Sequence, residues 1–166
     1  MITESSLKIR IVRKIEEIPV HDWDKLLPGG VENYYYFKTL DGSNLSTYSF
    51  FYILVYDNDT PVGAAPCFIM DFPLDIAVTG KLKMATGFIR NLFPSVLCPR
   101  VLICGLMMGQ GKLGIAAEPG KVIQVIYKGL ERIALEEKAA IVAFKDFDIS
   151  YKSLLDICLN YGFFRI

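Results

Sequence analysis

Side chains that bind metals or form disulfides are scarce in this chain of 166 residues. It has one histidine, and its four cysteines show no C-x-x-C spacing. A structural zinc site needs four cysteine or histidine ligands, usually in closely spaced pairs, and disulfide frameworks belong mainly to small secreted domains. The sequence therefore predicts no metal site and four reduced thiols, as expected of a cytoplasmic protein.

An excess of charge of either sign is lacking as well. Lysine and arginine together number 18, and aspartate and glutamate together number 18. Nucleic-acid-binding domains carry basic patches that neutralise phosphates, and anionic membranes attract the same kind of patch. We therefore expect no nucleic-acid partner.

No segment has the pattern of a signal peptide or of a membrane span. Residues 1–14 lack an apolar core followed by a cleavage site. The most apolar stretch, residues 84–108, is interrupted by Arg90, Pro94, Pro99 and Arg100. Charges and prolines at this density disfavour a helix that crosses a lipid bilayer, so no membrane span is expected.

What the chain does have is an unusually large share of apolar residues. Hydrophobic residues make up 52% of it and charged residues only 22%. Its length fits one domain, and a free-standing domain of this size normally has a more polar surface. Part of the surface is therefore expected to meet a protein partner.

Periodicity predicts an α/β chain. The first half is predicted to form a strand at 7–12, a helix from Asp22 to the Pro28-Gly29-Gly30 break, a short helix at 34–40 and a hairpin of strands at 49–56 and 62–70. The second half is predicted to form a strand at 100–105, a helix at 121–138, a strand at 140–144, a helix at 151–161 capped by Gly162, and a strand that begins at 163–166. Residues 71–99 have no clear period and are expected to be a long loop.

The glycine-rich turn from Gly109 to Gly114 is the motif with the clearest chemical meaning. It is predicted to join the 100–105 strand to the following helix. Glycines allow backbone N–H groups to converge on phosphate oxygens, Lys112 adds positive charge, and a helix N-terminus attracts anions. A tight connection without any ligand is the alternative, because glycine-rich turns are common.

The element order, with the motifs Gly111-x-x-Gly114-x-Ala116 and Leu154-x-x-x-Cys158-x-x-x-Gly162-Phe163, resembles the core of the acyl-CoA N-acyltransferase (GNAT) superfamily. The resemblance implies an α/β fold in which a mixed sheet is flanked by helices, with residues 1–166 as one domain. In that family the loop binds the coenzyme A diphosphate through backbone amides. Gly111 stands where the family has Arg or Gln, and Gln110 lies one residue out of register.

The resemblance implies acetyl-CoA or another acyl-CoA as cosubstrate, together with residues that bind it. The strand residues implied to orient the pantetheine arm are Ile103, Cys104 and Gly105. The loop residues implied to hold the diphosphate are Gln110, Gly111, Lys112, Gly114 and Ala116.

Two segments of the first half, Ile18–Pro28 and Val62–Pro66, resemble the predicted N-acyltransferases of the Fem-like branch. Proteins of that branch contain two GNAT-like halves, so the chain is expected to be the N-terminal half of a longer protein. A second GNAT-like half or another copy of the chain is then the expected partner for the apolar surface.

Three candidates for proton transfer follow from the same resemblance and from the strand ends. Cys158 holds the position at which many family members have a tyrosine that protonates the departing thiolate; the alternative is a small core residue. Asp146 and Asp148 follow the 140–144 strand and are candidates for a general base. Their alternative is a solvated strand end, with Asp148 capping the next helix.

Three functions therefore remain open. The first is transfer of an acyl group from acyl-CoA to an amine, on a small molecule or another substrate. The second is a non-catalytic GNAT-like half that docks a partner or shapes a substrate. The third is tRNA-dependent aminoacyl transfer, which the neutral charge disfavours. Open backbone N–H groups around Gly111–Gly114 would favour the first, and internally bonded ones the second.

Overall fold

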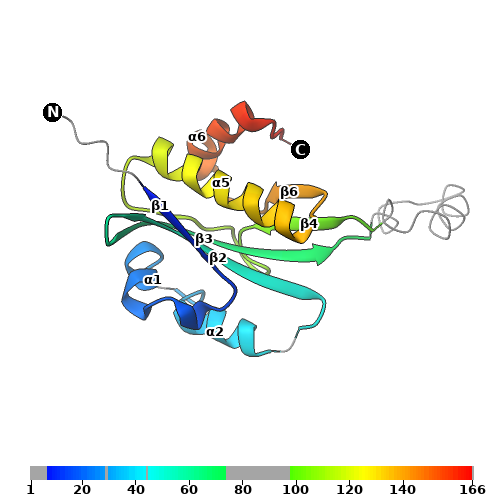
Figure 1. The fold of residues 1–166 in the computed structure, drawn as a ribbon, viewed down its shortest axis with the longest axis horizontal. Helices are drawn as coiled ribbons and strands as arrows, with labels where there is room; N and C mark the ends of the chain where they lie inside the picture. The colour runs from blue at the N-terminus through cyan, green and yellow to red at the C-terminus, as the bar shows by residue number, and fades with distance from the viewer. Residues whose placement is uncertain (1–6, 29, 44, 74–97, 166) are drawn as a thin grey trace, which may run out of the picture.

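The computed structural model describes residues 7–28, 30–43, 45–73 and 98–165. Helices cover both faces of a six-stranded mixed sheet, as the α/β prediction requires (Figure 1). The strands are β1 (Lys8–Val12), β2 (Tyr48–Asp57), β3 (Thr60–Asp71), β4 (Arg100–Cys104), β5 (Gly114–Ile115) and β6 (Ile141–Phe144). The helices are α1 (Val20–Leu26), α2 (Tyr34–Gly42), α5 (Pro119–Glu137) and α6 (Lys152–Leu155), with 3-10 turns η1 (Ile15–Glu17), η3 (Ile149–Tyr151) and η4 (Asp156–Tyr161).

The sheet has the order β1-β2-β3-β4-β6, and β5 pairs with β3 beyond the end of β4. The pairs β1–β2, β2–β3 and β3–β4 are antiparallel, whereas β4 and β6 are parallel. A parallel pair needs a crossover connection, and α5 provides it. The predicted hairpin is confirmed as β2 and β3, with Asn58 in the left-handed conformation at its turn.

Alternate residues of β2 face two separate cores. Ile53 and Val55 pack on the side of α5, whereas Tyr52 and Leu54 pack on the side of α1 and α2. In the second core the ring of Trp23 lies edge-on to Phe37, with 5.0 Å between ring centroids, and to Tyr52, at 5.5 Å. Strand β2 is therefore buried on both faces along these residues.

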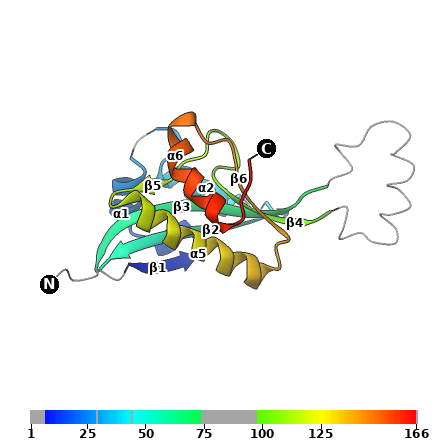
Figure 2. The same cartoon turned by 90° about the horizontal axis from the view of Figure 1, so that it is seen from above.

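The helix α5 is the longest element and lies across one face of the sheet (Figure 2). Its buried residues recur at helical spacing and are Val122, Ile123, Ile126, Gly129, Leu130 and Ile133. The helix ends at Glu137, and the capping residue Lys138 adopts the left-handed conformation and donates its N–H to the Ala134 carbonyl. The predicted helix at 121–138 is confirmed, with its start two residues earlier at Pro119.

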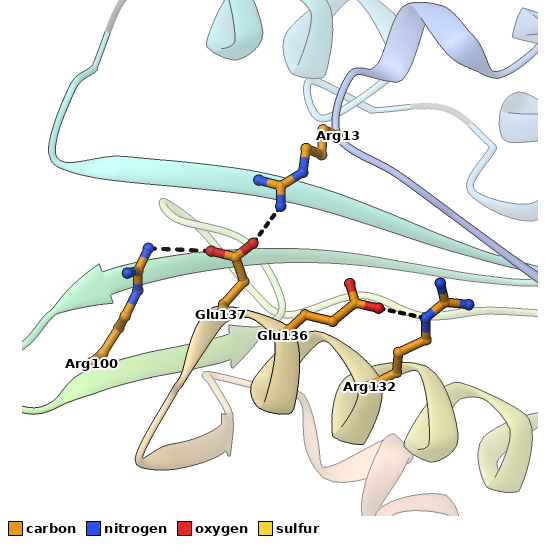
Figure 3. A network of polar contacts seen from close by, with 5 residues as sticks. All are labelled: Arg13, Arg100, Arg132, Glu136 and Glu137. Atoms are coloured by element: carbon orange, nitrogen blue, oxygen red, sulfur yellow. Dashed lines mark hydrogen bonds and ion pairs between the residues drawn. The ribbon is translucent and has the colours of Figure 1, made fainter.

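The last turn of α5 is tied to two strands through Glu137 (Figure 3). Its carboxylate accepts hydrogen bonds from Arg13, which follows β1, and from Arg100, which begins β4, the latter at 3.3 Å. The Arg13 guanidinium also lies 4.8 Å from the centroid of the Phe51 ring. One carboxylate thus joins the helix to the beginning of one strand and the end of another.

Three predictions about elements are wrong. The turn at 109–114 joins β4 to the short strand β5, not to a helix, because Gly114 and Ile115 pair with β3. The single helix predicted at 151–161 is a succession of short 3-10 and α-helical turns. Residues 163–165 do not form a strand.

The remaining expectations concern the long loop and the membrane. Most of the loop predicted at 71–99 falls on residues 74–97, outside the described residues. Among the helices that the structure describes, none has the length and apolarity needed to cross a membrane.

Candidate functional site

A groove of about 440 Å³ lies where α5 begins and α6 packs beside it. It is lined by Leu113, Ile115, Pro119, Ser150, Tyr151, Ser153, Leu154 and Ile157. The walls are mostly apolar and carry three hydroxyl groups. This mixture of apolar surface with a few polar groups is typical of a small-molecule site.

The segment from β5 into α5 borders this groove through Ile115 and Pro119. Pro119 occupies the first helical position, where a missing N–H does no harm. The N–H groups of Lys121 and Val122 both donate to the Glu118 carbonyl at 3.1 Å. The N–H of Gly120 makes no hydrogen bond with the described residues, so the helix start offers a donor beside the Lys121 side chain.

Gly120 also leaves open space above the helix start. A Cβ atom built on it would have only Ile157 Cδ1 nearby, at 4.0 Å. The neighbouring charges are mixed, because Lys121 Nζ lies 2.8 Å from the Glu118 carboxylate. An anion bound here would therefore compete with Glu118 for the Lys121 ammonium.

The glycines of the 109–114 turn serve close packing within the protein. A Cβ on Gly111 would lie 2.4 Å from the Lys145 carbonyl oxygen and 2.7 Å from the Phe147 ring. A Cβ on Gly114 would lie 2.7 Å from Leu26 Cβ. The space that a side chain would need is thus filled by other parts of the chain.

The backbone donors of this turn are largely used inside the protein. The Gly111 N–H donates to the Asp146 carbonyl at 2.9 Å, and the Leu113 N–H donates to the Tyr151 hydroxyl at 3.4 Å. The Ala116 N–H donates to the Val62 carbonyl at 2.9 Å. These three donors do not point to a ligand.

The predicted strand residues Ile103 and Cys104 lie in the middle of the sheet, paired with β3 and β6. Gly105 leaves the strand with φ of 130° and donates its N–H to the Pro66 carbonyl at 2.9 Å. Cys104 faces Cys67 of β3, and burial raises the pKa of the Cys104 thiol well above its ordinary value. Ile103 and Cys104 are thus core residues, and they do not line the groove at α5.

Comparison with protein-family models finds no match, and comparison with curated proteins finds none either. Solved structures do match. Aminoglycoside N-acetyltransferase AAC(6')-Iy in complex with CoA has a TM-score of 0.59 and 12% identity, covering 99% of this chain and 92% of that one. An aminoglycoside acetyltransferase from an uncultured soil metagenomic sample, in complex with trehalose, has a TM-score of 0.56 and 10% identity over 98% and 93%. Ribosomal-protein-alanine N-acetyltransferase from Brucella melitensis biovar Abortus 2308 has a TM-score of 0.52 and 9% identity over 89% and 84%.

The chain has the GNAT fold. Within it, the two polar loop residues lie away from the groove at α5. Lys112 Nζ pairs with the Glu32 carboxylate at 2.8 Å, before α2, and this hydrogen bond lowers the pKa of Glu32. Gln110 is exposed.

Asp146 and Cys158, two of the candidates for proton transfer, lie in different surroundings of the GNAT fold. Asp146 adopts the left-handed conformation after β6, and its exposed carboxylate pairs with the adjacent Lys145. Cys158 is 2% exposed and packs in the same core as Cys104. Burial, with a smaller contribution from Cys104, raises the pKa of the Cys158 thiol to about 11, so this thiol stays protonated.

Sequence reasoning missed Tyr151, the phenol that lines the groove. Its hydroxyl donates to the Leu113 carbonyl at 3.3 Å and accepts from the N–H of the same residue. The local signal was Asp148, whose side chain accepts from the Ser150 N–H at 2.9 Å and starts the turn that carries Tyr151. The capping interpretation of Asp148 is thereby confirmed, and this hydrogen bond lowers its pKa.

Proposed function

We propose that this chain is an N-acyltransferase that transfers an acyl group from acyl-CoA to an amine. The groove where α5 begins carries the proposal, because its mostly apolar wall lies at a helix start whose Gly120 N–H makes no hydrogen bond with the described residues. The structural neighbour AAC(6')-Iy was solved in complex with CoA. A small-molecule or protein amine would be the acceptor.

The start of α5 offers the best groups for binding the coenzyme A diphosphate. The N–H of Gly120 and the ammonium of Lys121 would hold its oxygens, and the helix dipole favours its negative charge. The pantetheine arm would then lie against Leu113 and Ile115 of the groove. In this proposal Gly111 and Gly114 have a packing role and do not contact the diphosphate. The diphosphate binds at the start of α5, and not at the 109–114 turn.

Acyl transfer requires that the amine be positioned at the acyl carbon, and it involves two proton transfers. The amine nitrogen attacks the acyl carbon, the carbon–sulfur bond breaks, and the departing thiolate takes up a proton. We assign this proton donor to Tyr151 because its hydroxyl lies in the groove, whereas Cys158 is buried in the core. Asp146, exposed at the carboxyl end of β6, remains the candidate base for the amine proton.

The test is ligand-induced thermal stabilisation by acetyl-CoA and by a long-chain acyl-CoA. Ligand at about 100 times its dissociation constant should stabilise the fold by about 2.7 kcal/mol. Gly120→Glu should abolish this shift without loss of stability, because the site is open and an acidic residue suits a helix start. Absence of any shift with millimolar ligand would exclude the proposal.

Gly42→Glu is the matched control. Gly42 ends α2 on the other face of the sheet, and a Cβ built there has nothing within 4 Å. This variant carries the same change of charge and size, so its shift with acetyl-CoA should equal that of the wild type. Equal losses in both variants would show that net charge, not the groove, governs binding.

A second candidate is a non-catalytic GNAT-like module. The internally bonded N–H groups of Gly111, Leu113 and Ala116 favour it, since they leave fewer donors for a diphosphate. A module of this kind would show no acetyl transfer to any amine in a thiol-release assay. Absence of both acetyl-CoA binding and turnover would favour it over the enzyme.

The finer relationship to the Fem-like branch also remains a proposal. It rests on the Ile18–Pro28 and Val62–Pro66 segments. Trp23 and Leu26 of the first segment belong to the core beneath the sheet, so this motif describes packing more than chemistry.

A further inference from the structure

Three of the four cysteines belong to the core between the sheet and α5. They are Cys67 of β3, Cys104 of β4 and Cys158 of η4, and their thiols have no role in the proposed acyl transfer. Cys67 is 2% exposed, and Cys104 is fully buried. Thiols that share one core can be joined in pairs by oxidation, provided that the backbone holds them at a suitable spacing.

Cys67 and Cys104 occupy a position at which the side chains of two strands come closest. They lie directly opposite each other in the antiparallel pair β3–β4. The Gly105 N–H donates to the Pro66 carbonyl at 2.9 Å, so the adjacent residue pair is a hydrogen-bonded one. Hydrogen-bonded and non-hydrogen-bonded pairs alternate along an antiparallel ladder, which makes Cys67 and Cys104 a non-hydrogen-bonded pair.

The spacing of this pair suits a disulfide. The Cα atoms of a non-hydrogen-bonded pair are about 4.5 Å apart, and disulfides join Cα atoms that are roughly 4.4–6.8 Å apart. Both thiols lie on the side of the sheet that α5 covers. The Cys67 thiol donates to the Ala65 carbonyl at 3.7 Å. Burial, and next the hydrogen bond with the Cys67 thiol, raise the pKa of the Cys104 thiol. The two sulfur atoms are therefore neighbours in the reduced chain.

We propose that Cys67 and Cys104 form a disulfide between β3 and β4 when the chain folds in the presence of a disulfide oxidant such as oxidised glutathione. One protein thiolate attacks the oxidant, which gives a mixed disulfide and one molecule of reduced glutathione. The second protein thiolate then attacks the protein sulfur of the mixed disulfide and releases the second glutathione. The pair loses two electrons and two protons, and the two glutathione thiols take them up.

Burial determines when this bond forms and how long it persists. Because neither sulfur is accessible in the folded chain, thiol exchange requires folding or a transient opening of the β3–β4 pair. The same burial protects the finished bond from reductants. The oxidation state of the pair therefore reflects the redox conditions under which the chain folded.

The first test is refolding of the reduced, urea-unfolded chain in a series of glutathione redox buffers, followed by acid quenching and peptide mapping without reduction. The Cys67–Cys104 link should be about tenfold or more as abundant as any other pairing, because folding holds these two thiols together. The control is the same oxidation in urea, where Cys98–Cys104 should dominate because it closes the shortest loop. A dominant Cys104–Cys158 link after refolding, or no protein disulfide at any glutathione ratio, would overturn the proposal.

The second test compares matched variants and the stability of the oxidised chain. Cys158→Ala should keep the link and Cys67→Ala should abolish it, and thermal unfolding verifies that each variant folds. The urea midpoint of the oxidised wild type should exceed that of the reduced protein. Dithiothreitol should reduce the bond about tenfold faster or more in urea than in the native protein, because burial protects it. A lower midpoint after oxidation would show that the native fold does not accommodate the bond, and equal reduction rates would contradict its protection.

Discussion

The N–H of Gly111 donates a hydrogen bond to the carbonyl oxygen of Asp146, with 2.9 Å between nitrogen and oxygen. This bond fastens the glycine-rich turn to the chain that leaves β6. One residue after Asp146, the ring of Phe147 covers Gly111 at a distance that leaves no room for a Cβ. The glycine-rich turn therefore serves close packing at the carboxyl ends of β4 and β6.

Replacing Gly111 by alanine should destabilise the protein by about 1–3 kcal/mol, the usual effect of overpacking. The added methyl group would meet the Lys145 carbonyl at 2.4 Å. Urea unfolding measures the change. Gly120→Ala is the control and should be neutral or slightly stabilising, because its site is open and helical. Equal losses at both positions would contradict the packing role.

Gly63→Ala should also destabilise by about 1–3 kcal/mol. Its Cβ would lie 2.5 Å from Val122 Cγ1 of α5 and 3.1 Å from Val55 Cβ. Combining it with Val122→Ala should give a smaller loss than the sum of the two single losses, with a coupling of about 0.5–3 kcal/mol. If the stability loss of the double variant, measured by urea unfolding, equals the sum of the two single losses, then Val122 of α5 does not limit the space at Gly63.

Asp41 should make stability fall as pH rises above its ordinary pKa. Burial raises the pKa of Asp41 from 3.8, although its carboxylate accepts hydrogen bonds from the Ile15 N–H at 2.7 Å and the Tyr52 hydroxyl at 2.8 Å. Between 3.8 and the raised pKa the folded form holds more protons than the unfolded form, so its stability declines across that window.

The measurement compares wild type with Asp41→Asn by urea unfolding at a series of pH values. Asparagine does not titrate, so wild-type stability minus variant stability should be highest in acid. It should decline through the window and stay constant above it. A difference that grows with pH would mean that the hydrogen bonds outweigh the burial.

Native alkylation should modify one cysteine of four. Cys98 is exposed, whereas Cys67, Cys104 and Cys158 are buried. Burial raises the pKa of both Cys104 and Cys158, which keeps these thiols in the unreactive protonated form. Peptide mapping after iodoacetamide treatment should find the label at Cys98 alone, and at all four in denaturant. Rapid native labelling of Cys158 would return it to the list of catalytic candidates.

Tyr151→Phe tests the proposed proton donor. It should destabilise by about 1 kcal/mol through the lost hydrogen bonds to Leu113. If the phenol protonates the thiolate, kcat should fall by about 10²-fold or more, with KM for acetyl-CoA little changed. Tyr161→Phe is the control, because Tyr161 stacks on Tyr127 at 4.4 Å and does not line the groove at α5. A Tyr151→Phe enzyme with wild-type kcat would exclude this role.

The elements that the sequence predicted well are those with a strong local period. The hairpin of β2 and β3 and the helix α5 follow from repeating apolar positions and from a turn with Asn58. The strand β5 escaped prediction because it has two residues, Gly114 and Ile115, and exists only through pairing with distant Gly63 and Ala64. Short strands of this kind have no local signature.

The candidate site was predicted in part. Motif spacing led to Gly111 and Gly114, neither of which lines the groove, while Tyr151, which lines it, and Gly120 at the adjacent helix start were not selected. Gly120 stands beside a proline and a lysine at the true helix start, and the helix boundary was two residues out. Helix ends are poorly marked in sequence because capping depends on local geometry.

The sequence by itself determined the order of the longer elements, their apolar faces and the α/β class, because these depend on residue spacing along the chain. Only the tertiary structure decided the purpose of the glycine-rich turn. The atoms that fill the space above Gly111 and Gly114 belong to Lys145, Phe147 and Leu26, which are remote in the sequence. Close packing between distant segments leaves no periodic signal in the sequence. For this reason the composition of the turn resembles that of a ligand-binding loop, although its contacts are those of a packed core.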